Sequence, residues 1–138
     1  MNPDKFSKFR RTIHFHSENY EFGFQSEKNL LPILSDYFAS DLQSLPEGDS
    51  FDFYSKKIES KFELKTRRCK KSQYFDTTFS KRKIDDIQKN DDFEYYFIFK
   101  FTDELCYWKF DRTTNLREYH IHGVNHVFIP IKNLVTIC

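Results

Sequence analysis

Residues 50–67, SFDFYSKKIESKFELKTR, alternate apolar and charged side chains, and this alternation constrains the fold more than any other feature of the chain. Successive side chains of a β-strand point to opposite faces, so a period of two is typical of a strand with one buried face. A polar connection at residues 55–57 separates two such strands and predicts a hairpin. We expect Phe62 to face the core, with Glu63 and Lys65 on the opposite side of the same strand.

The remaining hydrophobic pattern predicts an α/β fold. Apolar residues at helical spacing predict a helix within residues 25–45, and a second helix is expected over residues 78–89, with Thr77 or Thr78 as its N-cap. Further strands are predicted at residues 94–101, 105–110 and 127–131. This order of helix, two strands, helix and strands indicates a mixed α/β sandwich around a central sheet.

Length and composition favour one folded domain over residues 1–138. The chain has a mass of 16.9 kDa, and 19% of its residues are aromatic. This much aromatic surface at this length favours a single hydrophobic core. No apolar run approaches the ~20 residues that cross a bilayer. The first residues also lack the apolar segment of a signal peptide.

Cysteine usage indicates a reducing compartment. The three cysteines, Cys69, Cys106 and Cys138, are widely spaced and contain no CxxC pair. Neither a disulfide framework nor a zinc ribbon is therefore predicted. We expect a soluble, intracellular protein of the cytoplasm or nucleus, neither secreted nor attached to a membrane.

Two acidic residues and a lysine form the sharpest chemical pattern. A hairpin that turns near Lys57 sets Asp52 across from Glu63, and cross-strand β-carbons lie roughly 4.5–5.5 Å apart. Two carboxylates at that distance repel unless a cation lies between them, and Mg²⁺ prefers such hard oxygen ligands. Lys65, two positions after Glu63, shares its face and can hold the attacking water or neutralise charge on a phosphate.

A third acid, Glu27, precedes the apolar stripe of the first predicted helix by one turn. It is therefore expected to point toward the sheet, where an unpaired charge is costly. A metal site at the end of the hairpin would supply its partner.

Residues 24–110 resemble the PD-(D/E)XK nuclease superfamily, which includes many restriction endonucleases and archaeal-type Holliday-junction resolvases. The resemblance depends on a helix with Glu27, the segment Phe51-Asp52-Phe53, the segment Phe62-Glu63-Leu64-Lys65, a helix after Thr77, and paired strands. It implies a restriction-endonuclease-like core, a central mixed β-sheet flanked by helices. Independently of the resemblance, the polar residues 1–20 are expected to form an N-terminal arm. One departure is that Ser50-Phe51 precedes Asp52 where the name-giving motif has proline.

The same resemblance implies a role for each site residue. Asp52 and Glu63 would bind Mg²⁺, for which Mn²⁺ can substitute, and the Leu64 carbonyl would be a further ligand. Lys65 would position or activate water, and Glu27 would hold water at the metal. The implied activity is hydrolysis of DNA phosphodiester bonds, and a homodimer is expected because nucleases of this size commonly pair to cut two strands.

A second E-x-K pattern, Glu59-Ser60-Lys61, lies on the same predicted strand face. Chance produces this pattern readily in a chain rich in glutamate and lysine. We favour Glu63 over Glu59 because the large apolar residues Phe62 and Leu64 flank it.

Positive charge is concentrated after the candidate metal strand. Residues 61–83 carry nine basic and two acidic residues, whereas the remainder carries 13 basic and 19 acidic ones. Such patches bind phosphate backbones through counterion release. The basic stretch does not separate DNA from RNA, because phosphate contacts do not detect the 2′-hydroxyl. The candidate nucleic-acid-binding residues are Arg67, Arg68, Lys70, Lys71, Gln73, Tyr74, Thr77 and Lys81.

Two alternatives remain open at this point. One is a nucleic-acid-binding module with the same fold and basic patch but no catalysis. The other is a zinc-stabilised interaction protein, because histidines spaced i, i+2 on a strand can share a zinc ion. The histidines concerned are His14, His16, His120, His122 and His126.

Overall fold

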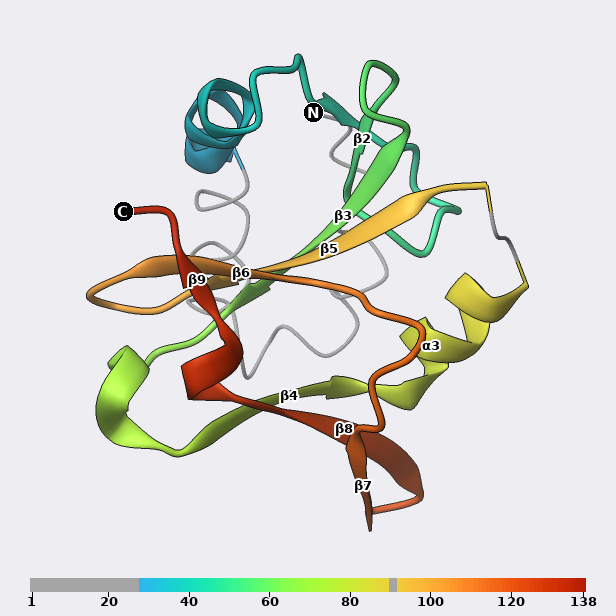
Figure 1. Ribbon diagram of the computed structural model, residues 1–138, viewed down its shortest axis with the longest axis vertical. Coiled ribbons are helices and arrows are strands. Elements are labelled where there is room, and N and C mark those ends of the chain that lie inside the picture. The colour runs from blue at the N-terminus through green and yellow to red at the C-terminus, as the bar shows by residue number, and fades with distance from the viewer. Residues whose placement is uncertain (1–27, 90–91) are drawn as a thin grey trace, which may run out of the picture.

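The computed structural model describes residues 28–89 and 92–138 (Figure 1). Its main element is a six-stranded sheet with strand order β1-β2-β3-β5-β6-β9. β3 and β5 are parallel, and the other neighbouring strands are antiparallel. The strands are β1 (Gln43–Ser44), β2 (Phe53–Ser55), β3 (Ser60–Thr66), β5 (Glu94–Lys100), β6 (Leu105–Lys109) and β9 (Val135–Thr136).

The parallel β3–β5 pair depends on a crossover, because parallel neighbours cannot be joined by a tight turn. The chain leaves β3, forms strand β4 (Asp76–Ser80) and helix α3 (Lys81–Gln88), and returns along β5. Glu63 pairs with Phe97 in the resulting register. The crossover thus brings α3 beside the strand that carries the candidate metal ligand.

Both faces of the main sheet are covered (Figure 1). Helical residues 28–37 pack on one face through Leu30 and Leu34, which contact the cluster that contains Phe62. α3 packs on the other face through Ile87, in the cluster that contains Phe97. Because Phe62 and Glu63 are adjacent on β3, the Glu63 side chain lies on the α3 side.

A second, three-stranded antiparallel sheet covers part of the α3 side. Its strand order is β4-β8-β7, with β7 at Arg117–Ile121 and β8 at Val124–Pro130. Two short 3₁₀ helices, η3 (Lys71–Gln73) and η4 (Ile131–Asn133), lie beside its ends. The predicted strand at residues 127–131 is part of β8, whereas the second sheet itself was not predicted.

The mixed α/β class and the central sheet predicted from the sequence are confirmed. The hairpin forms with its turn at residues 56–59, and the strands predicted at residues 94–101 and 105–110 correspond to β5 and β6. These elements were predictable because each strand buries alternate side chains or is apolar throughout.

The first helix is shorter than the predicted range of residues 25–45. Its described part ends at residue 37, and Gln43–Ser44 form β1 instead. Ala39 has a φ of 52°, and the Ser40 N–H donates to the Ser35 carbonyl at 3.0 Å. This is a left-handed helix C-cap, and it turns the chain away before the apolar stripe is exhausted.

The predicted start of the second helix at residue 78 was wrong. Residues 76–80 form β4, and α3 begins at Lys81 with Ser80 as its N-cap. Thr77 and Phe79 are buried alternately, which suits a strand, and β4 pairs with β8 from the far end of the chain. Long-range pairing therefore overrides the local helix signal.

All three cysteines are free thiols, as the sequence predicted. Among residues 28–89 and 92–138, no helix combines the length and apolar character that crossing a bilayer requires.

Candidate functional site

The hairpin brings Asp52 and Glu63 together. Asp52 directly precedes β2, and the ladder pairs Phe53 with Phe62, so Asp52 meets Glu63 at the next position. The charge of Asp52 lies close enough to Glu63 to raise the pKa of the Glu63 carboxyl group. The Leu64 N–H donates to Asp52 Oδ2 at 2.8 Å, which anchors the aspartate on the neighbouring strand.

Glu63 is a buried charged residue, with only 5% of its surface exposed. Burial raises the pKa of Glu63 from 4.5 to about 7, and the nearby charge of Asp52 adds to this shift. Two lysine charges, from Lys65 and Lys83, partly oppose it. A carboxyl group whose pKa lies near neutrality is typical of functional sites, because desolvation and a like charge are costly to fold stability.

Two lysines contact the same oxygen of Glu63. Lys65 Nζ lies 3.1 Å from Glu63 Oε2, and Lys83 Nζ lies 3.2 Å from it. Lys83 also donates to the carbonyl of Ser50 and lies 5.1 Å above the ring of Phe51. The lysines therefore bind the buried carboxylate from two elements, β3 and α3.

Lys83 belongs to this candidate site but was not predicted from the sequence. It was counted in the basic stretch but was not assigned to the site. Its contact with Glu63 depends on the crossover and on the true start of α3, and neither follows from local spacing. The available signal was its place in the first turn of the helix that follows the E-x-K strand.

The second E-x-K pattern does not reach the carboxylate pair. Glu59 is exposed in the hairpin turn with a φ of 47°, outside β3. Lys61 lies on the strand but forms an ion pair with Asp49 at 3.2 Å. Glu63, and not Glu59, therefore shares a site with Asp52.

Arg67 and Thr77, two predicted nucleic-acid contacts, lie within the fold. The Arg67 guanidinium donates to the carbonyl of Thr78 and, through Nε, to Thr77 Oγ1 at 3.3 Å. Burial lowers the pKa of Arg67, and Thr77 is 5% exposed. The Arg67 side chain thereby links the end of β3 to β4.

The other predicted nucleic-acid contacts lie at or near the surface. Lys71 is held by the Glu104 carboxylate at 3.7 Å, and Lys81 pairs with Glu118 at 3.0 Å. The exposed members of the predicted set are Arg68, Lys70, Gln73 and Tyr74. The positive surface after β3 is therefore smaller than the count of basic residues suggests.

The predictions for Glu27, His14 and His16 lie outside the described residues. His120 is exposed and bonds through Nδ1 to Asn125 Oδ1 at 2.6 Å, and His122 lies in the β7–β8 turn. In the described part of the chain, no three His, Cys, Asp or Glu side chains are grouped so that they could hold a metal ion. The described carboxylate pair, Asp52 and Glu63, falls short of such a group.

Neither the models of known protein families nor the curated proteins include a match to this chain. Function therefore has to be inferred from the arrangement of Asp52, Glu63 and their lysines.

Proposed function

We propose that this protein is a metal-dependent nuclease that hydrolyses DNA phosphodiester bonds. The observation that carries the proposal is the placement of Asp52 across the hairpin from the buried Glu63, with Lys65 Nζ 3.1 Å from Glu63. A purely structural role would require only one buried carboxylate with its cationic partner, because each further buried charge lowers stability. Two carboxyl groups across from each other, with lysines beside them, suit a site that binds a cation and a phosphate.

The chemistry of the donor set fits Mg²⁺ or Mn²⁺. Both carboxyl groups offer hard oxygen atoms, and their mutual repulsion is relieved by a divalent cation between them. The N–H and C=O groups of one strand residue point to the same side, so the Leu64 carbonyl faces the edge where its N–H meets Asp52. Asp52, Glu63 and the Leu64 carbonyl are therefore the residues that would hold the ion. When bound, such an ion supplies Lewis-acid stabilisation of the phosphate.

The lysines would act on the charges that the reaction develops. Lys65 would orient the attacking water and neutralise charge on the phosphate oxygens. Lys83, which contacts the same Glu63 oxygen, would keep this carboxylate ionised in the buried site. Both side chains remain partly exposed, 27% for Lys65 and 19% for Lys83, so solvent reaches the lysine side of the site.

The order of elements supports a restriction-endonuclease-like core as part of the proposal. Helical residues 28–37 precede the hairpin β2–β3, and α3 precedes the paired strands β5 and β6. This is the order that the resemblance implies over residues 24–110. Strands β1 and β4 are additions to it.

The test is cleavage of labelled duplex, single-stranded, flap and four-way-junction DNA with Mg²⁺, Mn²⁺ or EDTA. Wild type is compared with Lys65→Ala and with Lys61→Ala. Lys61 is the matched control because it lies on the same strand face but pairs with Asp49. We expect metal-dependent cutting by wild type and Lys61→Ala, and loss of at least about 100-fold in Lys65→Ala.

Binding without cutting by all three proteins in every metal would overturn the nuclease and leave a nucleic-acid-binding module. Zinc that copurifies with the protein and is lost on His120→Ala would instead indicate the zinc-stabilised interaction protein. A large drop in the melting temperature of Lys65→Ala would show that the residue acts in stability.

A further inference from the structure

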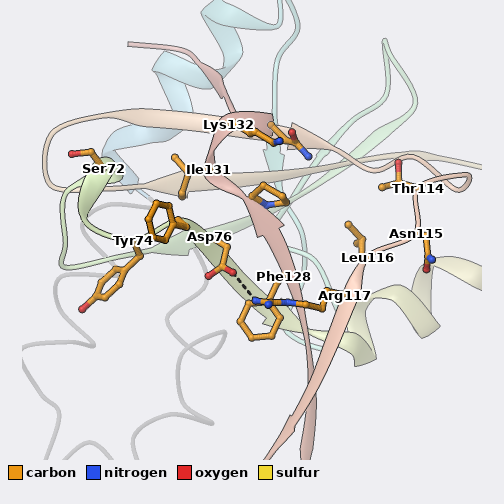
Figure 2. Close-up of a pocket in the computed structure, with 13 residues that line it drawn as sticks. Ser72, Tyr74, Asp76, Thr114, Asn115, Leu116, Arg117, Phe128, Ile131 and Lys132 are labelled. Carbon is orange, nitrogen blue, oxygen red and sulfur yellow. Dashed lines mark hydrogen bonds and ion pairs between the residues drawn. The ribbon is translucent and has the colours of Figure 1, made fainter.

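A hollow on the second sheet is lined by residues that the carboxylate site does not use. It has a volume of about 730 Å³ and lies between the start of β4, the loop before β7 and η4 (Figure 2). A hollow of this size accommodates a ligand of one or two rings with polar substituents. Its lining contains aromatic, amide and charged side chains, including Phe75, Phe128, Asn115 and Arg117.

Phe75 provides an aromatic surface at this hollow with almost no cover. Its ring is 96% exposed, and the neighbouring Tyr74 is 60% exposed. The Phe75 backbone is nonetheless fixed, because its carbonyl accepts the Ile131 N–H at 2.8 Å. An exposed ring on an anchored backbone offers a stacking surface, because the backbone needs no further ordering when a planar ligand binds.

Polar groups beside Phe75 are also held in place. Arg117 reaches across the ring of Phe128 to Asp76 (Figure 2). The guanidinium lies 4.5 Å from the ring centroid, and its NH2 atom lies 2.9 Å from Asp76 Oδ2. Arg117 remains highly exposed, with 71% of its side chain accessible. This arrangement presents fixed donors and an acceptor next to aromatic carbon, as recognition of a nucleobase edge requires.

A second, smaller hollow of about 160 Å³ adjoins the first, and the two share Tyr74, Asp76 and Ile131. Lys70 lines the smaller hollow and Lys132 the larger one, and both lysines are exposed. Of the cationic residues in the two linings, Arg67 is bound to Thr77 and Thr78, Lys71 pairs with Glu104, and Arg117 pairs with Asp76. The positive charge offered to a ligand therefore comes mainly from Lys70 and Lys132. The charge favours an anionic ligand over an apolar peptide.

We propose that the larger hollow binds an unpaired nucleobase, stacked on Phe75, with the adjoining phosphates near Lys70 and Lys132. The proposal rests on the proposed action on nucleic acid and deepens it by naming the substrate class, a strand with unpaired bases. Bases in an intact duplex are stacked on one another and cannot lie on a protein ring. The hollow therefore selects single strands, flaps or ends over blunt duplex.

The test measures binding in EDTA, so that it does not depend on cleavage. The probes are a labelled oligothymidine of about 10 nucleotides and a blunt hairpin duplex. Phe75→Ala is compared with Tyr37→Ala, which removes a 44% exposed ring from the helix on the other face of the main sheet. Phe75→Ala should weaken oligothymidine binding by about 5- to 150-fold, the range for one stacked base, and leave duplex binding unchanged. Tyr37→Ala should bind both probes like wild type.

Equal oligothymidine affinity of Phe75→Ala and wild type would overturn the proposal that the hollow binds a nucleobase, whatever the outcome of the cleavage test. The same holds if Phe75→Ala and Tyr37→Ala weaken binding equally, or if wild type binds duplex alone. Absence of binding to either probe would overturn the hollow alone, because the proposed nuclease is judged by cleavage in the presence of metal. Phe75-dependent binding without cleavage in any metal would support the hollow and overturn the catalytic proposal alone.

Discussion

Lys83 Nζ lies 3.2 Å from Glu63 Oε2, so the first turn of the crossover helix places a positive charge against the strand that it connects to its parallel neighbour. The contact couples the topology of the fold to the ionisation of the buried carboxyl group. Shifting α3 along its axis by one turn would remove the charge from Glu63. Asp52 would then be its main charged neighbour besides Lys65.

The first prediction concerns stability as a function of pH. The pKa of Glu63 rises from 4.5 in the unfolded chain to about 7 in the folded protein. Between these values the folded state binds more protons than the unfolded state, so the free energy of unfolding falls as the pH rises, by up to about 3 kcal/mol in total. Glu63→Gln removes this dependence. In urea unfolding from about pH 5 to about pH 8, the free energy of unfolding of Glu63→Gln should therefore rise relative to that of wild type.

A constant difference between Glu63→Gln and wild type over that range would contradict the raised pKa. Asp111→Asn serves as the control, because the pKa of Asp111 is lowered by hydrogen bonds to Thr113 and this residue is exposed. Its variant should not gain on wild type as the pH rises.

The second prediction concerns the effect of the Lys83 charge on the pKa of Glu63. Lys83→Met removes a charge that lowers the pKa of Glu63, so this pKa should rise above about 7. Lys81 lies two positions before Lys83 and pairs with Glu118, so Lys81→Met should leave the pKa of Glu63 unchanged. A carbon-detected NMR titration of the Glu63 carboxyl group measures both. An unchanged pKa of Glu63 in Lys83→Met would show that solvent screens the contact.

The pairing of Asp52 with Glu63 could be predicted because it is local. Eleven sequence positions and one polar turn separate the two residues, and the alternation of apolar side chains sets the register of the hairpin. The choice of Glu63 over Glu59 was also predictable from the flanking Phe62 and Leu64. In the structure Glu63 lies across from Asp52 and is 5% exposed, whereas Glu59 is exposed in the turn.

The second sheet and the role of Lys83 could not be predicted in the same way. Every residue of β7 is exposed, so this strand has no buried face to produce an alternating pattern. β4 pairs with β8, about fifty positions further along the chain, and a pairing of this range leaves no local mark. The predicted helix began too early and included part of β4, because this strand leads into the helix at residues 81–88 without a loop.

The third prediction concerns Arg67, which joins the main sheet to the second one. Arg67→Ala loses the hydrogen bonds to Thr77 and Thr78, and leaves the Thr78 carbonyl without this donor. We expect the free energy of unfolding to fall by about 2 to 4 kcal/mol. Arg82→Ala, on the exposed side of α3, should change it by less than about 0.5 kcal/mol. Thermal unfolding of the three proteins measures the difference, and equal stability would mean that β4 is held by its pairing with β8 alone.

The last prediction concerns the residue that ends the first helix. Ala39 has a φ of 52°, a left-handed conformation in which its β-carbon is crowded and which glycine adopts freely. Ala39→Gly should therefore raise the free energy of unfolding by about 1 kcal/mol, since relief of this crowding outweighs the added freedom of the unfolded chain. Asp36→Gly places the same residue within the helix and should lower it by up to about 1 kcal/mol. Chemical denaturation of both variants decides the sign. A loss of stability in Ala39→Gly would mean that the helix continues past residue 37 in solution and that β1 does not form where the structure has it.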